Sequence, residues 1–399
     1  SFGNCRGIGR QGRLRFFSFC RQVVACIASV AFFMKSIFFT LNVIIDLAGH
    51  FLMFLIWRHF FGFSELYLQV TVGVILLGAI FLTVLAPLLV YWRDNIWSRS
   101  LYLVVGLWEG LMLNSVLLAL VFIVFDFFGV YEISSWSTGV RWWWLGALPL
   151  LLLAPEAWLA QATRIRQVSV NIINLPDSWQ GKEIAHITDV HLGPVWRQRF
   201  FDKLVHRVNS LEAEAVFITG DLFDGMDTDF SWFHQRQFVA RKGVFYALGN
   251  HDLILGEARL RTLLANSNIQ ILSNEIVTVD NLQIVGLNCY YEGRLDVKGK
   301  ILSQLGYELD KPSILLYHEP KDLEAAREAG IDLQLSGHTH GGQMFPFNLV
   351  AKILYRGFSG GLYHLKNFSL SVSFGVGTWG PPLRLGSRSE ITLIKLLKA

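Results

Sequence analysis

Five short apolar segments of this sequence each run into a cluster of Asp, Asn, His or Gly residues. The first reads HITDVHL at 186–192 and places Asp189 and His191 two positions apart. At the end of a strand, both side chains would point to the same side, because strand side chains alternate between faces. The other four read AVFITGDLFD (215–224), VFYALGNHD (244–252), SILLYHEP (313–320) and DLQLSGHTH (332–340). Carboxylates, carboxamides and imidazoles bind metal ions, so the pattern predicts a metal site that five strands assemble at one sheet edge.

The segments between these motifs indicate the elements that must position them. Residues 165–173 alternate in polarity like an edge strand, and residues 200–210 resemble a helix between the first two site-bearing strands. Strand, helix and strand at this spacing predict parallel crossovers and an α/β domain. We also expect helices at 257–264 and 321–329, and strands at 282–287, at 313–317 and within 368–397.

The amino-terminal part of the chain has the composition of a membrane region. Hydrophobic residues make up 52% of the 399 residues and charged residues only 17%, which is too apolar for an ordinary soluble protein. Three long apolar runs, at 66–92, 101–128 and 142–160, exceed or approach the roughly 20 residues that cross a bilayer. The region 22–57 is ambiguous, and we favour a span at 36–57 after an interfacial helix at 23–34.

The sequence therefore predicts two parts: a membrane region of about four transmembrane helices in residues 1–161, and a metal-binding domain in residues 162–399. Arginines are enriched in residues 1–21, in the loop with Arg93 and Arg99, and after the last span at Arg164 and Arg166. The positive-inside rule then places the metal-binding domain in the cytoplasm, and a fifth span would reverse this orientation.

Other composition features exclude some classes of function. The net charge of +4 is modest and does not favour nucleic acid as a partner. The four cysteines are scattered without a C-x-x-C pair, so neither a zinc knuckle nor a disulfide framework is indicated. No pattern indicates an oligomeric state.

Polar residues also occur inside the predicted membrane region. Asn42, Asp46 and His50 are four positions apart and would share one face of a helix at 36–57. Polar groups in a membrane are costly and often functional, but we favour a helix-packing stripe, or an interfacial position in a differently placed span, as the interpretation. Glu109 is expected at the level of the lipid headgroups.

The ordered set of motifs resembles the calcineurin-like metallophosphoesterases. It consists of D-x-H (189–191), G-D-x-x-D (220–224), G-N-H-D (249–252), the isolated His318 and G-H-T-H (337–340), and it covers roughly residues 165–398. One departure is that Tyr317 precedes His318 where a Gly often stands in the family. The segments LPDSWQGKEIAHITDVHLGP and GPPLRLGSRSEITLI further resemble a bacterial subgroup with an amino-terminal membrane region. That subgroup includes enzymes that act on UDP-2,3-diacylglucosamine.

The resemblance implies an α/β/β/α sandwich and a centre of two divalent metal ions, which would be manganese, iron or zinc. It implies that Asp189, His191 and His340 hold one ion, that Asn250, His318 and His338 hold the other, and that Asp221 bridges them. Two ions about 3.5–4 Å apart clamp a phosphate and lower the pKa of a water between them.

The remaining site residues have supporting roles in this interpretation. His251 resembles the family histidine beside the leaving-group oxygen. Asp224 and Asp252 are expected to orient histidines. Arg384 and Arg388 are candidates for a phosphate contact, with a structural salt bridge near Glu390 as the alternative. We expect ordinary packed or surface positions for His186, His206, His234 and His364.

The substrate is less directly indicated. The apolar stretch 344–363 follows the last metal histidines, and it either forms a lip toward the bilayer or acyl chains, or covers a sheet edge. The insertion 289–311, with Tyr290 and Tyr291, is a candidate cap. A membrane anchor favours a lipid-linked phosphodiester or pyrophosphate, with UDP-2,3-diacylglucosamine as the specific hypothesis, hydrolysed at the bacterial inner membrane. The alternatives are a tethered generic or nucleotide phosphodiesterase, and a membrane receptor or transporter whose phosphoesterase-like domain only binds a ligand.

Overall fold

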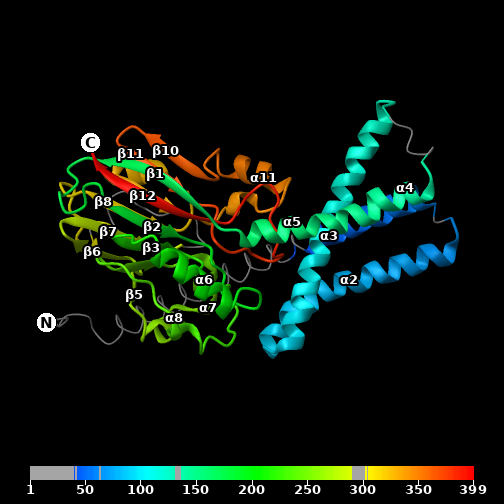
Figure 1. Cartoon of the computed structure of the whole chain (residues 1–399), viewed down its shortest axis with the longest axis horizontal. Helices are drawn as coiled ribbons and strands as arrows, with labels where there is room; N and C mark the ends of the chain where they lie inside the picture. Colours follow the sequence, from blue (N-terminus) through cyan, green and yellow to red (C-terminus); the bar gives the residue numbers. More distant parts are fainter. Residues whose placement is uncertain (1–39, 41–42, 63, 131–135, 290–301, 303) are drawn as a thin grey trace, which may run out of the picture.

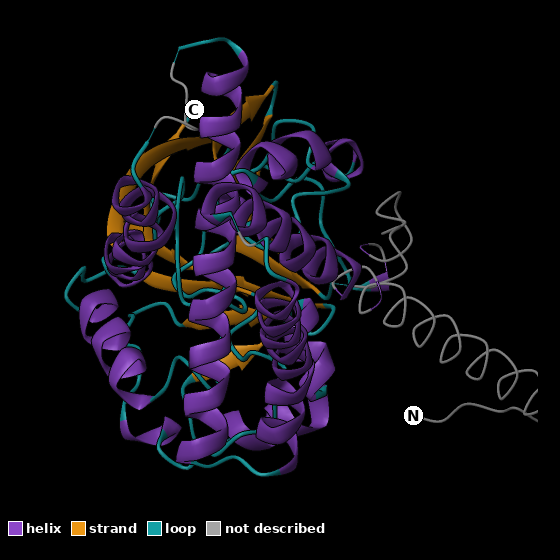
Figure 2. Cartoon of the chain, turned by 90° about the vertical axis from the view of Figure 1, so that its right-hand side faces the viewer, coloured by secondary structure: helices purple, strands orange, loops and turns teal. Residues whose placement is uncertain are grey.

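The structure is a computed structural model that describes residues 40, 43–62, 64–130, 136–289, 302 and 304–399. Figure 1 shows an α/β domain with a set of long helices extending from one end of it. In Figure 2, which views the molecule from that end, the long helices lie in front of the strands.

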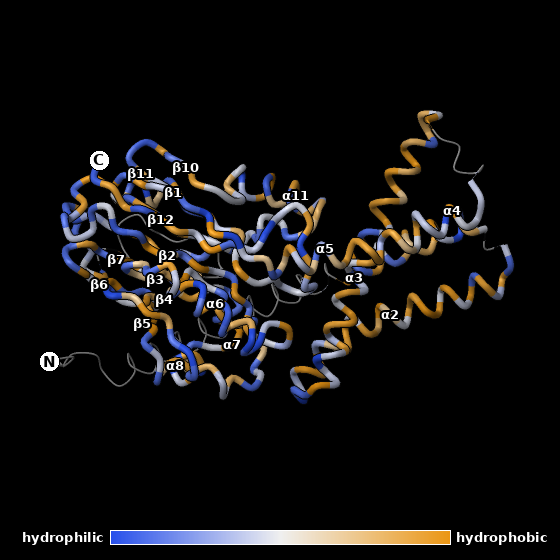
Figure 3. The backbone as a smooth tube through the Cα atoms, viewed as in Figure 1, coloured by the Kyte–Doolittle hydropathy of each residue, from blue (hydrophilic) through white to orange (hydrophobic). Residues whose placement is uncertain are grey.

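Within the part of the chain that the structure describes, four helical segments are long and apolar enough to cross a membrane. They are Val43–Phe61, α2 (Leu66–Trp92), α3 (Ile96–Phe127), and the segment Thr138–Gln161, which is made of α4 (Thr138–Trp142), η2 (Trp143–Ala147) and α5 (Leu148–Gln161). The described residues thus contain four candidate spans, as expected, and Figure 3 shows the hydrophobic colouring along these helices. The basic segment 1–21 and the interfacial helix expected at 23–34 lie outside the described residues.

α3 begins five residues earlier than the apolar run suggested. The side chain of Asn95 accepts hydrogen bonds from the amides of Trp97 and Ser98, which caps the helix amino terminus. Polarity alone placed the boundary at residue 101 because Ser98, Arg99 and Ser100 interrupt the apolar run. These polar residues lie in the first turns of the helix, next to the α/β domain.

Two six-stranded sheets form the α/β domain. The first has the order β1 (Arg164–Ile172), β12 (Glu390–Lys398), β2 (Glu183–Ile187), β3 (Ala215–Thr219), β4 (Val244–Ala247) and β5 (Ile269–Ile271). The second has the order β10 (Gly361–Leu365), β11 (Phe368–Val372), β9 (Leu333–Ser336), β8 (Ser313–Tyr317), β7 (Leu282–Leu287) and β6 (Glu275–Val279). β1 is an edge strand, as its alternating polarity predicted.

The two sheets pack face to face and helices cover their outer faces. The buried layer between the sheets includes Trp179, Phe217 and Leu316. Outside the first sheet lie α6 (Gln198–Asn209), α7 (Asn250–Leu255) and α8 (Glu257–Leu264), and the layer outside the second sheet includes α10 (Leu323–Glu328). This arrangement is the expected α/β/β/α sandwich.

The membrane helices and the α/β domain meet along α3 and α5. Leu383 packs against the site of Gly110 on α3, where a Cβ atom would collide with Leu383 and lie 3.2 Å from Leu153 of α5. The amide of Arg384 donates to the carbonyl of Glu156 in α5 at 3.1 Å. The loop that carries Leu383 and Arg384 is thus held by two membrane helices.

An ion network joins the two parts at the amino-terminal end of α3. Asp94 accepts hydrogen bonds from Arg99 and from the amide of Asp229, the latter at 3.1 Å, and it lies 3.6 Å from Arg197. The pKa of Asp94 is lowered because these hydrogen bonds and the arginine charges outweigh the effect of its burial.

Candidate metal centre

All five predicted motifs converge at one end of the sandwich, where loops follow the carboxyl ends of β2, β3, β4, β8 and β9. The geometry differs from the expectation in one respect. β2 ends at Ile187, so Asp189 and His191 are not alternating strand residues. Both have φ of 51°, in the left-handed region, as do Asp221, His338 and His340 at 48–67°. Non-glycine residues adopt this conformation at a cost, and strain of this kind concentrates at functional sites.

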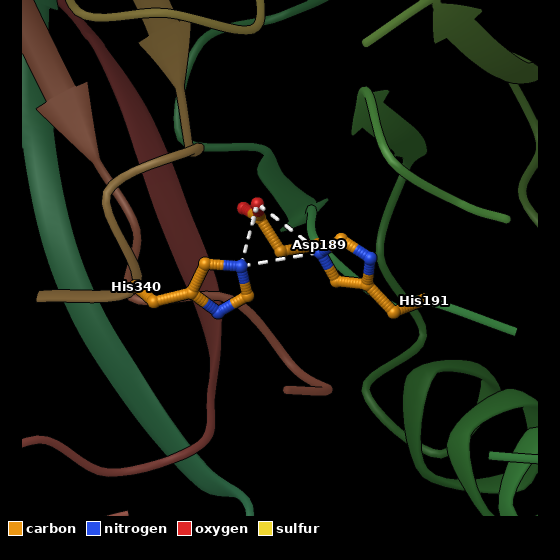
Figure 4. A group of neighbouring side chains, drawn as sticks. All are labelled: Asp189, His191 and His340. Atoms are coloured by element: carbon orange, nitrogen blue, oxygen red, sulfur yellow. Dashed lines mark hydrogen bonds and ion pairs between the residues drawn. The ribbon is translucent and has the colours of Figure 1, made fainter. Parts of the chain in front are cut away.

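The first half of the centre contains Asp189, His191 and His340, which Figure 4 shows pointing toward one another. The Nε2 atoms of His191 and His340 are 3.1 Å apart, and Nε2 of His340 is 3.3 Å from Oδ1 of Asp189. Two ligand atoms that are each about 2.1 Å from one ion lie roughly 3.0–3.4 Å apart. The spacing therefore fits a shared metal ion.

The second half of the centre contains Asp221, His318 and His338. Nε2 of His318 is 3.0 Å from Oδ2 of Asp221 and 3.1 Å from Nδ1 of His338. The same Asp221 oxygen lies 3.9 Å from Nε2 of His191 in the first half. Asp221 is thus placed between the two groups, where a shared carboxylate reduces the repulsion between two cations.

Asn250 supplies the observation that tests whether metal ions fit this arrangement. Its Oδ1 atom is buried and has no hydrogen-bond partner in the structure. The next residue, His251, donates its amide to Oδ1 of Asp221 at 2.8 Å, which places this loop at the centre. A buried carbonyl oxygen without a donor is costly unless it binds a cation. The donor set of imidazoles, carboxylates and one carboxamide therefore fits two divalent ions.

Hydrogen bonds to the ring nitrogen that does not face the centre fix the orientation of the histidine rings. Nδ1 of His191 is 3.1 Å from Asp224, as expected for an orienting carboxylate, and Nδ1 of His318 donates to the carbonyl of Thr219 at 2.7 Å. Both contacts leave Nε2 for a metal ion. Glu319, 3.7 Å from Nε2 of His338, has a comparable position that sequence reasoning missed. In the sequence, the only indication that Glu319 belongs to the site is its position next to His318 in the Y-H-E-P motif.

The interpretation of Asp252 requires a correction. Its oxygens accept hydrogen bonds from the amides of Gly249, Asp221 and Phe223 at 2.6–3.1 Å. Asp252 therefore ties two ligand-bearing loops together rather than orienting a histidine. Burial and the charge of Asp221 raise the pKa of Asp252 to about 6.

His251 lies beside the first half of the centre and is only partly buried. Its Nδ1 donates to the backbone carbonyl of Asp224 at 3.0 Å, so Nε2 is the nitrogen that can face a substrate. Its ring is 4.8 Å from that of His191 and 6.0 Å from that of Trp379. This geometry suits a proton donor to a leaving group.

The pKa values of the two imidazoles in the second half are shifted in opposite directions. Burial lowers the pKa of His318, but the charge of Asp221 outweighs it and raises that pKa to about 10. Burial and the charge of His318 lower the pKa of His338 to about 4. A cation that binds His318 must displace its proton, so the metal affinity of the site decreases as the pH falls.

The two arginines considered for phosphate binding are engaged by protein groups. Arg384 is fully buried, and it donates to the carbonyls of His340, Phe374 and Gly377 at 2.6–3.2 Å. Nε of Arg388 donates to the carbonyl of Ala162 at 2.9 Å, and its guanidinium lies over the Trp158 ring. Glu390 instead pairs with Arg164 and Arg166 at 2.8 and 3.1 Å. Arg384 thus supports a metal ligand, and Arg388 joins the membrane helices to the domain.

Polar residues of the membrane helices form a separate cluster. Asp46 and His50 are 2.9 Å apart, and a carboxylate oxygen of Glu109 lies within 4.8 Å of them. Trp108 donates to Nε2 of His50 at 2.8 Å, which engages both ring nitrogens. Asn42 and the tyrosines 290 and 291 lie outside the described residues.

Comparison with known proteins identifies the family. The sequence profile of the calcineurin-like phosphoesterases matches residues 182–342. An uncharacterized metallophosphoesterase of Campylobacter jejuni is 37% identical over 258 residues, which are 63% of this chain and 69% of that protein. A bovine transmembrane protein with a metallophosphoesterase domain is 33% identical over 268 residues, covering 60% of this chain and 58% of that protein. A Helicobacter pylori metallophosphoesterase is 35% identical over 220 residues, 54% of this chain and 60% of that protein.

The chain thus spans about 60 to 70% of the length of these relatives. It belongs to the calcineurin-like metallophosphoesterases, which hydrolyse phosphoesters at a centre of two divalent metal ions. Its membrane helices are a feature that the name of the bovine relative also states.

Proposed function

We propose that this protein hydrolyses a phosphodiester or pyrophosphate bond in a lipid-linked substrate, such as UDP-2,3-diacylglucosamine. In this proposal residues 1–161 anchor the chain in a bacterial inner membrane, and residues 162–399 are a cytoplasmic phosphoesterase domain.

The observation that carries the proposal is the position of the metal centre directly beside the membrane helices. Asp94, just before α3, accepts a hydrogen bond from the amide of Asp229, five residues after Asp224, and Asp224 contacts the metal-ligand candidate His191. The loop of Leu383 and Arg384 also packs on α3 and α5, and Arg384 donates a hydrogen bond to the carbonyl of His340. A substrate that remains in the bilayer would therefore reach this centre without leaving the membrane surface.

Each side chain of the centre has a separate role in the proposed reaction. Bound metal ions would supply Lewis-acid polarisation of the phosphoryl group and a more acidic attacking water. Asp189, His191 and His340 would hold one ion, Asn250, His318 and His338 the other, and Asp221 both. His251, in its imidazolium form, would place a proton from Nε2 on the departing oxygen and keep its Nδ1–H on the carbonyl of Asp224. Asp224 would keep the His191 ring in its binding orientation.

The test is hydrolysis by the purified full-length chain in detergent, with UDP-2,3-diacylglucosamine and bis(p-nitrophenyl) phosphate assayed in parallel. Manganese is added or removed with a chelator, and Asp221→Asn is compared with the parent. Asp227→Asn is the matched control, because that aspartate is in a nearby loop, is exposed, and pairs with Arg259. We expect metal-dependent cleavage of the lipid that Asp221→Asn abolishes and Asp227→Asn retains.

The outcomes separate the alternatives. Cleavage of only the generic diester would support a tethered phosphodiesterase and reject the lipid substrate. Absence of both activities in a protein with bound metal would contradict the enzymatic proposal and support a ligand-binding domain.

A further inference from the structure

The helix that follows the last metal ligands exposes an unusually apolar surface. α11 (Phe347–Leu354) carries Leu349, Ile353 and Leu354, which are 52%, 77% and 71% exposed, and Val350 and the preceding Phe345 are also exposed. Residues 349, 350, 353 and 354 recur at the spacing of one helix face. In a surface helix of a soluble domain this face would be polar.

The opposite face of α11 already has its packing partner. Ala351 is buried, and Asn348 lies so close to Gly342 that a Cβ atom there would overlap it. Gly342 ends the short helix η4 (His340–Gly342), which contains a metal-ligand candidate. The apolar residues therefore do not cover a sheet edge, which was one of the two expectations for this stretch.

α11 lies on the side of the domain from which the membrane helices extend, as Figures 1 and 3 show. Gln343, just before it, donates to the carbonyls of Trp379 and Pro381 at 3.0 Å. Pro381 in turn is 3.3 Å from a Cβ built on Gly106 of α3. Only one loop thus separates the exposed apolar face from a membrane-spanning helix.

Charges and a groove border this face. Lys352 and Arg356 are exposed beside the apolar residues, and cations at this level attract anionic lipid headgroups. Behind α11 a groove of about 920 Å³ is lined by residues that include Leu354, Tyr355, Arg356 and Lys366. The ring of Tyr355, one of these lining residues, is 6.1 Å from the ring of His338.

We propose that α11 is an interfacial helix whose apolar face lies in the headgroup region of the bilayer, next to the helix η4 that contains the metal-ligand candidate His340. The occupant of this face is the lipid surface itself, preferably an anionic one. Helices with an apolar face and basic neighbours bind membranes in this orientation. The inference concerns membrane contact and requires no particular substrate.

The direct test is spin labelling of the full chain in nanodiscs of phosphatidylethanolamine and phosphatidylglycerol. Single cysteines replace Leu349, Lys352 or Ile353 after removal of the native cysteines. The matched control is Val239→Cys, a 68% exposed apolar position just before β4, whose amino-terminal end lies opposite the metal-binding loops. We expect labels at 349 and 353 to collide more with oxygen than with a water-soluble nickel complex, and labels at 352 and 239 to show the reverse. Nickel collisions at 353 as frequent as at 239 would overturn the proposal.

A second variant links the surface to function. Ile353→Glu with Leu354→Glu should raise KM for a lipid-linked phosphoester about tenfold and leave hydrolysis of bis(p-nitrophenyl) phosphate unchanged. Equal effects on both substrates would contradict a role in membrane contact. If the parent cleaves no lipid while the 353 label still resides in lipid, the proposed substrate fails and the interfacial helix stands.

Discussion

At the scale of single residues, the centre combines two kinds of histidine. The ligand candidates use one ring nitrogen for the centre and anchor the other, as His318 does through the carbonyl of Thr219. His251 anchors Nδ1 in the same way, on the carbonyl of Asp224, and its Nε2 is the nitrogen proposed to serve the substrate. Anchoring fixes the tautomer, so each ring has one defined chemical role.

The role of His251 can be tested with two leaving groups. His251→Gln should lower kcat about 10²-fold for a diester with a poor alkoxide leaving group, because that oxygen needs a proton in the transition state. The same variant should change hydrolysis of bis(p-nitrophenyl) phosphate less than about fivefold, because nitrophenolate leaves without a proton. Bound metal, measured on both proteins, serves as the control. Equal losses on both substrates would indicate that His251 only shapes the site.

A second residue-scale prediction concerns pH. Burial, aided by the charge of Arg166, lowers the pKa of His186 to about 3, whereas an unfolded chain has a value near 6.5. The folded state therefore resists protonation, and its stability falls as the pH decreases from about 6.5 towards 3. When the pH is lowered from 7 to 4.5, protonation of this residue in the unfolded chain should lower the free energy of unfolding by roughly 2–3 kcal/mol.

The measurement is thermal unfolding in detergent with a chelator present, so that metal loss does not contribute. His186→Gln keeps a partner for the hydroxyl of Thr219, which lies 2.7 Å from the ring. Between pH 7 and pH 4.5, the Tm of the variant should fall less than the Tm of the parent. Identical pH profiles would show that His186 does not govern acid stability.

At the scale of elements, much of the fold could be predicted from the periodicity of apolar residues, and much of the site from the residue types in the five ordered motifs. Helix α8 and strands β7 and β8 occupy the predicted residues, since their apolar pattern and turn residues coincide. The left-handed backbone at Asp189 and His191 could not be predicted, because only tertiary contacts stabilise it in these residue types. The same limit applies to Asp252, whose amide partners lie 3–31 positions away in the chain.

The packing of α3 on the loop of Leu383 yields an element-scale prediction. Gly110→Val should disturb this contact, lower Tm and reduce hydrolysis, because the added methyl groups occupy the space of Leu383. Adding Leu383→Ala should restore part of both losses. Gly78→Val in α2 is the control, because nothing lies within 4 Å of a Cβ atom at that glycine. Absence of rescue would indicate that the damage arises within α3 itself.

At the scale of the whole molecule, four crossings by the described candidate spans would place residue 43 and the phosphoesterase domain on the same side of the membrane. The short loop between Phe61 and Leu66 then lies on the opposite side. Arginines at positions 93 and 99 favour the cytoplasm for the domain side.

Labelling of cysteines in intact cells would test this orientation. We expect a membrane-impermeant maleimide to label Ser64→Cys in spheroplasts and to label Val239→Cys only after permeabilisation, because both positions are exposed and the proposed topology places them on opposite sides of the membrane. Parent protein without cysteines gives the background. Labelling of position 239 in intact spheroplasts would reverse the proposed topology.

The position of β12 has a consequence for biosynthesis. This strand lies between β1 and β2, and Arg166 of β1 binds Thr392 of β12 across 226 positions of the chain. The strand that precedes Asp189 can pair with β3 early, but it lacks its second neighbour, β12, until residues 390–398 have left the ribosome. By that time the membrane helices, which are synthesised first, can already be inserted by the translocation machinery. The growing polypeptide is thus committed to a bilayer before its metal-binding loops can assemble, which restricts where in the cell a competent enzyme is first produced.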